Sequence, residues 1–372
     1  MGKRFLITLI IMEALVGGLA LVYIVSALWR TPLGPTLAMP TQTSQSEVSS
    51  PRSSVVEPQS TQPAPEPTAT PSSLLNKIAA ILQPPTATNE VLCGGPPVMT
   101  ILLVGSDERK NDYYYGLADS MRAVRIDFTT PGVMVLDFPR DLWVEIPDIS
   151  DHYGINQGKL NQAYFYGNPG MGYYDGPGEG PGLLARTLDL NYGLQVDHYL
   201  AINREIFYNI VDAIGGVDIY LDSIIDLNQG QDGANPDLVL EPGYHHLDAE
   251  LTLKLAIDRN PTIFQRARYQ NIVLSALQDK LLNPAMLGQL PGLAAQFSQS
   301  VQTDLSPSDI QKLICIGQKL TKENTNMVAF PDDMFTSGST YDPYRKVNTY
   351  TLSVDLERIK AYVADFMSGI WP

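Results

Sequence analysis

The sequence predicts an α/β domain with a central mixed sheet flanked by helices, preceded by one transmembrane helix. Short runs rich in Val, Ile and Leu alternate with longer segments of helical pattern, which favours a single domain with a mostly buried sheet. The chain has 372 residues, of which 44% are hydrophobic, so it is long enough to bury a sizeable core. An almost entirely apolar run near the N-terminus indicates the transmembrane helix.

That apolar run extends from Phe5 to Trp29. As a helix rising about 1.5 Å per residue it would reach roughly 37 Å, which spans a hydrocarbon core of about 30 Å. Lys3 and Arg4 precede the run, so the positive-inside rule places residues 1–4 in the cytoplasm and the rest of the chain outside. A cleaved signal peptide is the alternative, but its apolar region is normally only about 7–15 residues long. We therefore expect a single-pass protein of the cell membrane with an extracytoplasmic main part.

Residues 30–90 are expected to form a disordered linker rich in Pro, Ser and Thr. They contain too little apolar surface to offset the loss of chain entropy on folding. As a coil of about 60 residues, this linker would set the domain roughly 40–50 Å from the membrane on average.

Residues 91–372 form the expected folded domain. Its strand candidates are Val98–Val104, Met121–Asp127, Val133–Phe138, His198–Ile202 and Val217–Tyr220. Its helix candidates are Gly182–Leu190, Arg204–Ile214, Ala249–Leu255, Gln265–Leu282, Pro284–Leu290, Pro307–Leu320 and Val354–Met367. Ser306 and Ser353 are the N-cap candidates of the last two helices, and Pro291 is expected to end the helix that begins at Pro284. The glycine-rich stretch from Gly167 to Gly182 is expected to be a mobile loop.

The number of cysteines and the net charge limit which bonds and partners are expected. Cys93 and Cys315 are the only cysteines, and outside the cell they could form a disulfide or remain as two small core residues. The net charge is −15, so nonspecific binding to nucleic acid is not expected, because the phosphate backbone would be repelled.

Two aspartates are the first candidates for a functional site. Asp107 ends the Gly-Ser-Asp segment that directly follows an apolar strand, and Asp119 stands just before the next strand. Two carboxylates brought together suit a hard cation such as Mg²⁺, which fills its other positions from phosphate and water. The alternative is two turn-capping aspartates that accept backbone hydrogen bonds.

Positive side chains are the second group of candidates. Arg140 follows an apolar run and could hold a pyrophosphate oxygen, or it could simply pair with Asp141. Lys159 follows a loop and could be solvated. The further candidates lie near one another in a chain short of positive charge, and they could instead form a solvated helix face. They are Arg259, Arg266, Arg268 and Gln270. No His-x-x-x-His or Cys-x-x-Cys spacing occurs, so a catalytic zinc site is not expected.

With these residues in place, the chain resembles the LytR-CpsA-Psr family of cell-wall glycopolymer ligases. The matching pieces occur in the order ILLVGSDER, LADSM, VLDFPRDLWVEIP, KLNQAYFYG, VDHYLAINREIFYNIVDAIGGVDIYL, and YHHLDAELTLKLAIDR followed by FQRARYQ. The resemblance implies a phosphotransferase that takes a glycopolymer from a polyprenyl pyrophosphate carrier. It would attach that polymer to peptidoglycan through a phosphodiester, with Mg²⁺ (or Mn²⁺) as cofactor.

The resemblance also implies roles for single residues. Asp107 and Asp119 would bind the metal ion and Arg140 would grip the pyrophosphate, which makes these three the catalytic candidates. The residues implied around the pyrophosphate are Arg109, Lys159, Arg259, Arg266, Arg268 and Gln270. The apolar interior between the sheet and its helices would hold the polyprenyl tail.

The chain departs from the family pattern at three positions where an arginine is usual. Leu117, Ile257 and Tyr269 stand there instead, and Arg268 or Arg122 could compensate. Arg122 and Arg125 are three apart on a strand, so they point to opposite faces and at most one can serve the site. Fewer cations would weaken pyrophosphate binding. Two rival functions therefore stay open, a non-catalytic protein that binds polyprenyl lipids or wall polymers, and a hydrolase that passes the pyrophosphate to water.

Overall fold

A six-stranded mixed sheet forms the centre of the fold. The structure is a computed structural model that describes residues 29–39, 90–108, 113–228, 235–258, 263–298 and 300–371. The sheet has the order β11-β6-β1-β2-β3-β12 and consists of β1 (Val98–Ser106), β2 (Ala118–Asp127), β3 (Gly132–Asp137), β6 (His198–Asn203), β11 (Gln302–Thr303) and β12 (Thr325–Val328). Strands β1, β2 and β3 are antiparallel neighbours, whereas β6 lies parallel to β1 and β12 lies parallel to β3. The expected mixed sheet is confirmed.

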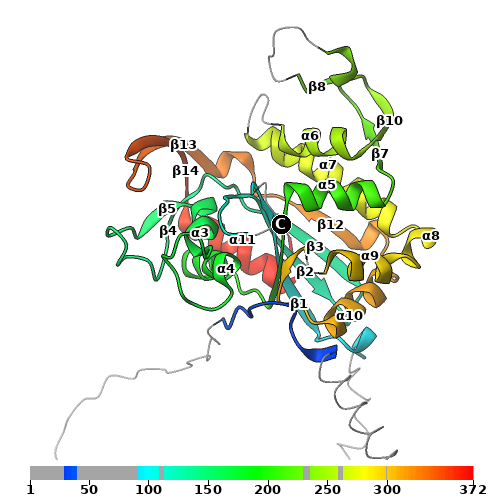
Figure 1. Ribbon diagram of the computed structural model, residues 1–372, viewed down its shortest axis with the longest axis horizontal. Coiled ribbons are helices and arrows are strands. Elements are labelled where there is room, and N and C mark those ends of the chain that lie inside the picture. The colour runs from blue at the N-terminus through cyan, green and yellow to red at the C-terminus, as the bar shows by residue number, and fades with distance from the viewer. Residues whose placement is uncertain are drawn as a thin grey trace, which may run out of the picture. The chain divides into compact units, whose positions relative to one another are not determined.

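Helices cover both faces of this sheet (Figure 1). The helices are α3 (Leu160–Gly167), α4 (Glu179–Tyr192), α5 (Arg204–Ala213), α6 (Ala249–Ile257), α7 (Ile263–Leu281), α8 (Pro284–Leu287), α9 (Leu290–Phe297), α10 (Pro307–Gly317) and α11 (Leu356–Ser368). Because side chains alternate along a strand, Leu102 and Val104 of β1 enter the core with α3, α4 and α11, while Met99 and Ile101 face α10. Helices α5, α6 and α7 lie over the remaining part of that second face.

Four small two-stranded ribbons complete the fold. They pair β4 (Trp143–Glu145) with β5 (Gln157–Lys159), β7 (Val217–Leu221) with β10 (Gly243–Leu247), β8 (Ile225–Asp226) with β9 (Val239–Leu240), and β13 (Phe335–Asp342) with β14 (Val347–Val354). The β13–β14 hairpin stands beside β4 and β5 (Figure 1).

Several local expectations differ from the structure. Pro291 does not end a helix but occupies the first turn of α9, where its missing N–H costs nothing. Ser353 belongs to β14, and the N-cap of α11 is Asp355. The glycine-rich stretch contains the start of α4 at Glu179 and so is not all loop. Helix α3 and strands β12 to β14 were not among the expected elements. Ser306 does cap α10, because its hydroxyl accepts the Asp309 N–H.

Of the two alternatives for the cysteines, the structure has the disulfide, which joins Cys93, just before β1, to Cys315 on α10. These two positions are separated by 222 residues in the sequence. The bond therefore links the start of the folded domain to a late helix.

Residues 31–39 differ from the expected linker because they lie against the domain. Leu37 is only 2% exposed and belongs to the main core. The Tyr199 hydroxyl donates to Pro35 O at 2.9 Å, and Leu33 N donates to Leu305 O at 3.2 Å. The expected linker therefore begins no earlier than residue 40. The expected transmembrane helix at 5–29 falls almost wholly outside the described residues, as do the cytoplasmic tail and residues 40–89. Within the described part of the chain, no helix has the length and apolarity needed to cross a bilayer.

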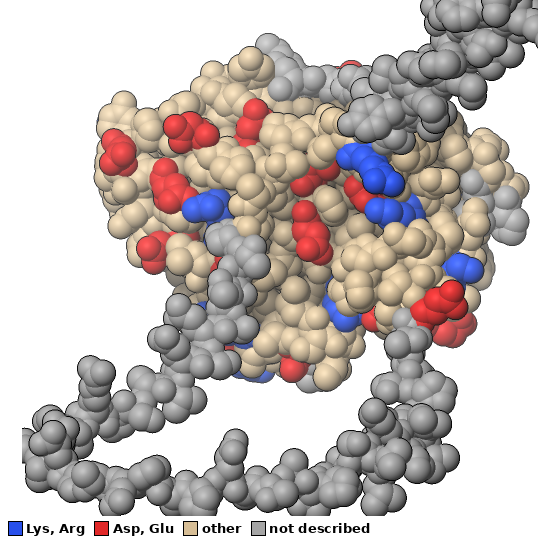
Figure 2. Space-filling view, turned by 90° about the horizontal axis from the view of Figure 1, so that it is seen from below, with Lys and Arg blue, Asp and Glu red and all other residues tan. Residues whose placement is uncertain are grey.

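The charged surface agrees with an acidic protein. On the face that Figure 2 shows, acidic side chains are scattered over a mainly uncharged surface, and lysines and arginines occur only in small groups. That face offers no extended basic area for a polyanion.

Candidate functional site

The candidate site lies at one edge of the central sheet. Ser106, the last residue of β1, pairs with Ala118 of β2 and with Asn203 of β6. The residues next to these pairs, Asp107, Asp119 and Arg204, therefore reach the same edge. This edge lies at the carboxyl ends of the parallel strands β1 and β6, where α/β folds commonly bind ligands.

Asp119 stands at the centre of a group of arginines. Its Oδ1 accepts a hydrogen bond from Arg140 Nη1, and Arg204 Nη2 lies 3.3 Å from its Oδ2. Arg266 Nη1 lies 3.8 Å from the same oxygen. The Asp119 side chain is 13% exposed, so these ion pairs are poorly screened by water. One carboxylate facing three guanidiniums leaves local positive charge in a chain that is acidic overall.

Asp141 holds the same group from the other side. Its carboxylate is 3% exposed and lies 2.8 Å from Lys159 Nζ and 3.3 Å from Arg140 Nε. Burial disfavours the charged Arg140 guanidinium, but Asp119 and Asp141 outweigh that effect and raise the pKa of Arg140 above its ordinary value. Arg140 is therefore a permanent cation, fixed by two carboxylates. Of the two alternatives for Arg140, the ion pair with Asp141 is present.

Asp107 has a different environment. Its Oδ1 accepts the Leu117 N–H at 2.7 Å, and its own N–H donates to Leu117 O at 3.0 Å. It therefore fits the turn-capping alternative, although it ends on the same β1–β2 hairpin as Asp119.

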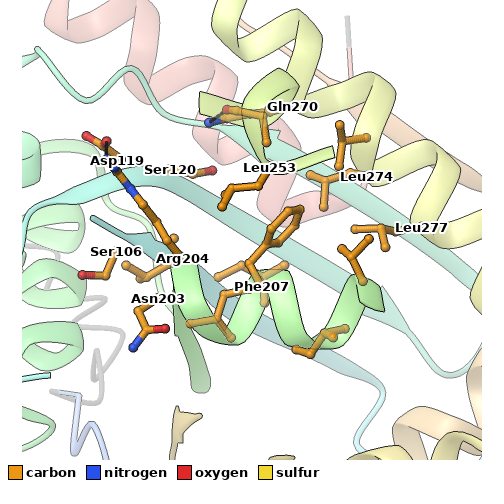
Figure 3. A pocket seen from close by; sticks show the side chains of 18 of the residues that line it. Ser106, Asp119, Ser120, Asn203, Arg204, Phe207, Leu253, Gln270, Leu274 and Leu277 are labelled. Carbon is orange, nitrogen blue, oxygen red and sulfur yellow. Dashed lines mark hydrogen bonds and ion pairs between the residues drawn. The ribbon is translucent and has the colours of Figure 1, made fainter. Parts of the chain in front are cut away.

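An apolar cavity of about 220 Å³ opens next to this charged group (Figure 3). Its floor is the second face of the sheet, with Leu103 and Leu200, and its walls come from α5, α6 and α7. Phe207, Leu253, Leu274 and Leu277 point into the cavity, while Asp119 and Arg204 stand together at one end of it (Figure 3). The cavity is thus an apolar slot with a charged end.

A smaller polar cavity continues from that charged end. It is lined by Asp119, Ser120, Asp137, Phe138, Pro139, Arg140, Asp141, Arg266, Ala267 and Gln270. Asp119, Ser120 and Gln270 line both cavities, so the polar and apolar spaces adjoin. An elongated ligand with an anionic head and an apolar tail would match both.

Most of the predicted site residues come together in the structure. Asp119, Arg140, Arg266 and Gln270 line the polar cavity, and Lys159 reaches it through Asp141.

Of the remaining predicted residues, one lies away from the site and two cannot be placed. Arg268 does not join the site, because its side chain is 66% exposed and pairs with Asp332 at 3.4 Å. Arg109 and Arg259 lie outside the described residues.

The two arginines of β2 serve opposite faces, as expected. Arg122 is 2% exposed and contacts Gln270 and Asn271 of α7 on the cavity side. Arg125 donates to Met367 O of α11 on the other side. Arg122 also pairs with Asp137 at 3.3 Å, so it supports the wall of the site rather than adding charge to it.

Arg204 was missed by the sequence reasoning. It is the first residue of α5, after the N-cap Asn203, whose side chain accepts the Ile206 N–H at 2.9 Å. The available signal was the expected strand His198–Ile202 followed at once by a helix. A cation at such a junction lies at the edge where β1 also ends, provided that β6 is recognised as the neighbour of β1.

The donor set for a metal ion is small. Among the described residues, no group of three or more His, Cys, Asp or Glu side chains could hold a metal. Mg²⁺ does not require such a group, because it often uses one or two carboxylates and takes phosphate oxygens and water as its other ligands. Asp107 and Asp119 are the two carboxylates that the β1–β2 hairpin offers, and pyrophosphate would first have to draw the arginines away from Asp119.

Comparison with known proteins points to one family. The model of the LytR_cpsA_psr family matches residues 94–357 of the chain. The teichoic acid transferase TagU of Oceanobacillus iheyensis is 28% identical over 219 residues, which cover 58% of this chain and 62% of TagU. The regulatory protein MsrR of Staphylococcus aureus is 26% identical over 216 residues, which cover 57% of this chain and 58% of MsrR. The chain thus spans less than two thirds of either relative.

A solved structure shares the fold. The structure of TagT bound to LIIa-WTA aligns with a TM-score of 0.55 at 19% identity, covering 76% of this chain and 96% of that one. This likeness supports the α/β architecture described above.

Proposed function

Because the chain belongs to the LytR-CpsA-Psr family, we propose that it transfers a glycopolymer from a polyprenyl pyrophosphate carrier to peptidoglycan. The relative TagU is named a polyisoprenyl-teichoic acid–peptidoglycan teichoic acid transferase, and a relative with this name supports our proposal of this class of reaction. We place the reaction at the outer face of the cell membrane, with the chain anchored by residues 5–29 and its N-terminus in the cytoplasm.

The observation that carries the proposal is the apolar cavity that ends at a group of guanidiniums. The cavity wall of Phe207, Leu274 and Leu277 suits a hydrocarbon chain, and Arg140, Arg204 and Arg266 suit phosphate oxygens. A polyprenyl pyrophosphate is an apolar chain that ends in two adjacent phosphates. It matches the two cavities in the order in which they adjoin.

The three arginines would act on the leaving group. They bind the pyrophosphate oxygens and neutralise the negative charge that develops on the departing polyprenyl phosphate. A hydroxyl of the acceptor sugar forms a new P–O bond to the phosphorus that bears the glycopolymer, and the P–O bond to polyprenyl phosphate breaks. The hydroxyl proton passes to one of two carboxylates, Asp107 or Asp119. Pyrophosphate competes with Asp119 for the guanidiniums, so ligand binding would free that carboxylate.

Asp107 and Asp119 would also hold the metal ion. Asp107 directly follows β1 and Asp119 lies near the start of β2. Together these two residues would bind Mg²⁺ (or Mn²⁺) beside the phosphates. When bound, the ion would polarise the phosphoryl oxygens and neutralise part of their charge.

A direct assay tests this function. The full-length chain in nanodiscs is incubated with a polyprenyl-pyrophosphate-linked saccharide and peptidoglycan oligomers, with Mg²⁺ or with a chelator, and the products are identified by mass spectrometry. We expect a phosphodiester-linked product that depends on Mg²⁺. Asp119→Ala should slow its formation at least about 100-fold, the effect typical of removing an electrostatic or proton-transfer group.

A matched control separates the site from a surface ion pair. Asp148 pairs with Arg186 at 2.7 Å on the surface, so Asp148→Ala removes an aspartate from an arginine pair away from the site. It should leave the rate within about twofold. Release of free glycosyl phosphate without an acceptor would favour a hydrolase, and bound but unreacted lipid would favour a non-catalytic binding protein.

A further inference from the structure

The outward face of the β13–β14 hairpin carries a small group of neutral polar and aromatic side chains. In the hairpin register Ser339 pairs with Tyr350 and Tyr341 pairs with Asn348, so these four residues share one face, here called the tyrosine face. Tyr341 is 56% exposed and Tyr350 is 44% exposed. The opposite face is partly buried. It includes Asp342, Thr349 and Thr351, all of which are buried.

The tyrosine face adjoins the candidate site. Leu352, two residues beyond Tyr350, donates its N–H to Asp141 O at 2.8 Å and forms a bridge with Leu142. The Asp141 carboxylate is the group that binds Lys159 and Arg140. The pKa of Tyr350 is raised, first by partial burial and then by the negative charge of Asp141. A ligand lying along the hairpin would therefore have one end near Arg140.

The hairpin is held firmly at its turn. Asp342 Oδ1 accepts the N–H groups of Tyr344 and Arg345, each at 3.0 Å, and its Oδ2 accepts Gln162 Nε2 of α3 at 2.9 Å. The Tyr344 ring makes edge contacts with Phe165 and Tyr166, with centroids 5.4 and 5.6 Å apart. A surface fixed in this way loses little conformational entropy when a ligand binds.

The chemistry of the tyrosine face suits a sugar chain. Aromatic rings attract the polarised C–H groups on the faces of pyranose rings, and hydroxyl and amide groups form hydrogen bonds with sugar hydroxyls. None of its four residues carries a formal charge, so the face is not built for a polyanion. The two exposed cations of the hairpin, Arg345 and Lys346, lie at its far end, away from Tyr350.

We propose that the tyrosine face binds the acceptor glycan strand of peptidoglycan and directs one sugar hydroxyl toward the phosphate at Arg140. This assignment rests on the proposed transfer reaction and names the place where its second substrate binds. The hydroxyl oxygen becomes bonded to phosphorus, polyprenyl phosphate leaves, and the proton passes to Asp107 or Asp119 as described above. The face itself orients the acceptor and takes no part in bond making.

Direct binding tests the assignment without relying on turnover. The full-length chain in nanodiscs is titrated with a soluble, uncrosslinked peptidoglycan glycan strand by calorimetry, with no lipid donor present. The double variant Tyr341→Ala/Tyr350→Ala should raise the dissociation constant of the strand about tenfold, since two stacking rings are lost. The Tyr→Phe double variant keeps both rings and should stay within about threefold of the unmodified chain.

A tyrosine elsewhere provides the matched control. Tyr244 on β10 is 86% exposed and packs against Tyr220, away from the hairpin. Tyr244→Ala should leave binding of the glycan strand unchanged, and melting temperatures of all variants report whether folding is intact.

Kinetics then separate the acceptor from the donor. With both substrates present, the alanine double variant should raise KM for the acceptor and leave KM for the lipid-linked donor unchanged. Unaltered acceptor binding would overturn the assignment, and so would a loss confined to the donor, which would place the glycopolymer on this face. If the unmodified chain binds the strand through the two tyrosines but transfers nothing, the transfer reaction fails while the glycan-binding face stands.

Discussion

Asp107 and Asp119 both lie on the β1–β2 hairpin, yet their carboxylates have different neighbours. Asp107 accepts a backbone N–H from Leu117, whereas Asp119 is surrounded by Arg140, Arg204 and Arg266. At the scale of single residues, the difference in partners divides their roles. Asp119 fixes the three guanidiniums, and Asp107 accepts a backbone hydrogen bond that holds the turn beside it.

Arg204 and Arg268 provide a paired test of the phosphate site. Arg204→Ala removes a guanidinium beside Asp119 and should raise the dissociation constant for polyprenyl pyrophosphate about 10- to 100-fold, as expected for a lost charge-assisted hydrogen bond. Arg268→Ala removes a guanidinium of equal charge that pairs with Asp332 on the surface, and it should change binding by less than about twofold. Lipid binding to nanodisc-embedded protein measures both. Equal losses for the two variants would mean that only net charge matters.

Part of this site was predictable from the sequence and part was not, for identifiable physical reasons. Asp119, Arg140 and Arg266 were predicted because each lies in a motif at an expected strand end or helix. Arg204 was missed because its place depends on β6 pairing with β1, a contact between segments about a hundred residues apart. Arg268 was expected at the site but lies on the surface. It follows Arg266 by two positions on the same helix, so the two side chains point about 200° apart around the helix axis.

At the scale of elements, the chain's apolar strands and longer helices were predictable, and its polar hairpin was not. The strand β1 was expected at Val98–Val104 and extends to Ser106, a difference of two residues at one end. The segment Phe335–Asp342 reads FTSGSTYD and has almost no apolar residues, so its pattern predicts no strand. It forms one because Thr340, Thr349 and Thr351 turn inward and pair across the ribbon.

The start of α11 offers a test at this scale. Asp355 accepts the N–H groups of Glu357 and Arg358 at 3.0 and 3.1 Å, and α11 buries Ile359, Val363 and Phe366 against the main core. Asp355→Ala should therefore lower the free energy of unfolding by about 1 kcal/mol. Chemical denaturation measures the change, with Asp355→Asn expected to retain most of the stability.

Ser353 is the natural control for this cap. It was the expected cap, but it lies in β14 and its hydroxyl contacts Thr336 O at 3.4 Å. Ser353→Ala should change stability by less than about 0.5 kcal/mol. A larger loss for Ser353→Ala than for Asp355→Ala would contradict the observed start of the helix.

At the scale of the whole molecule, the disulfide closes most of the folded chain into a loop. It joins residues 222 positions apart and attaches α10 to the segment before β1. Reduction should lower the free energy of unfolding by about 2–5 kcal/mol, because the unfolded chain regains freedom. Thermal melting with and without reductant measures this loss. The double variant Cys93→Ser/Cys315→Ser should melt at one temperature in both conditions, and a reductant effect that persists in it would have another cause.

The docked residues 31–39 change how the domain would be connected to a membrane anchor at residues 5–29. Leu37 lies in the core before residues 40–89 and the disulfide-bonded Cys93 lies after them, so both flanks of this stretch are fixed to the same domain. The length of a segment that is attached at both ends to one domain does not set the distance of that domain from a membrane anchor. If residues 5–29 cross the bilayer, that height depends instead on the short connection between Trp29 and Leu33. The domain would then stand on the membrane surface, within reach of a lipid that remains embedded while its phosphates are being processed.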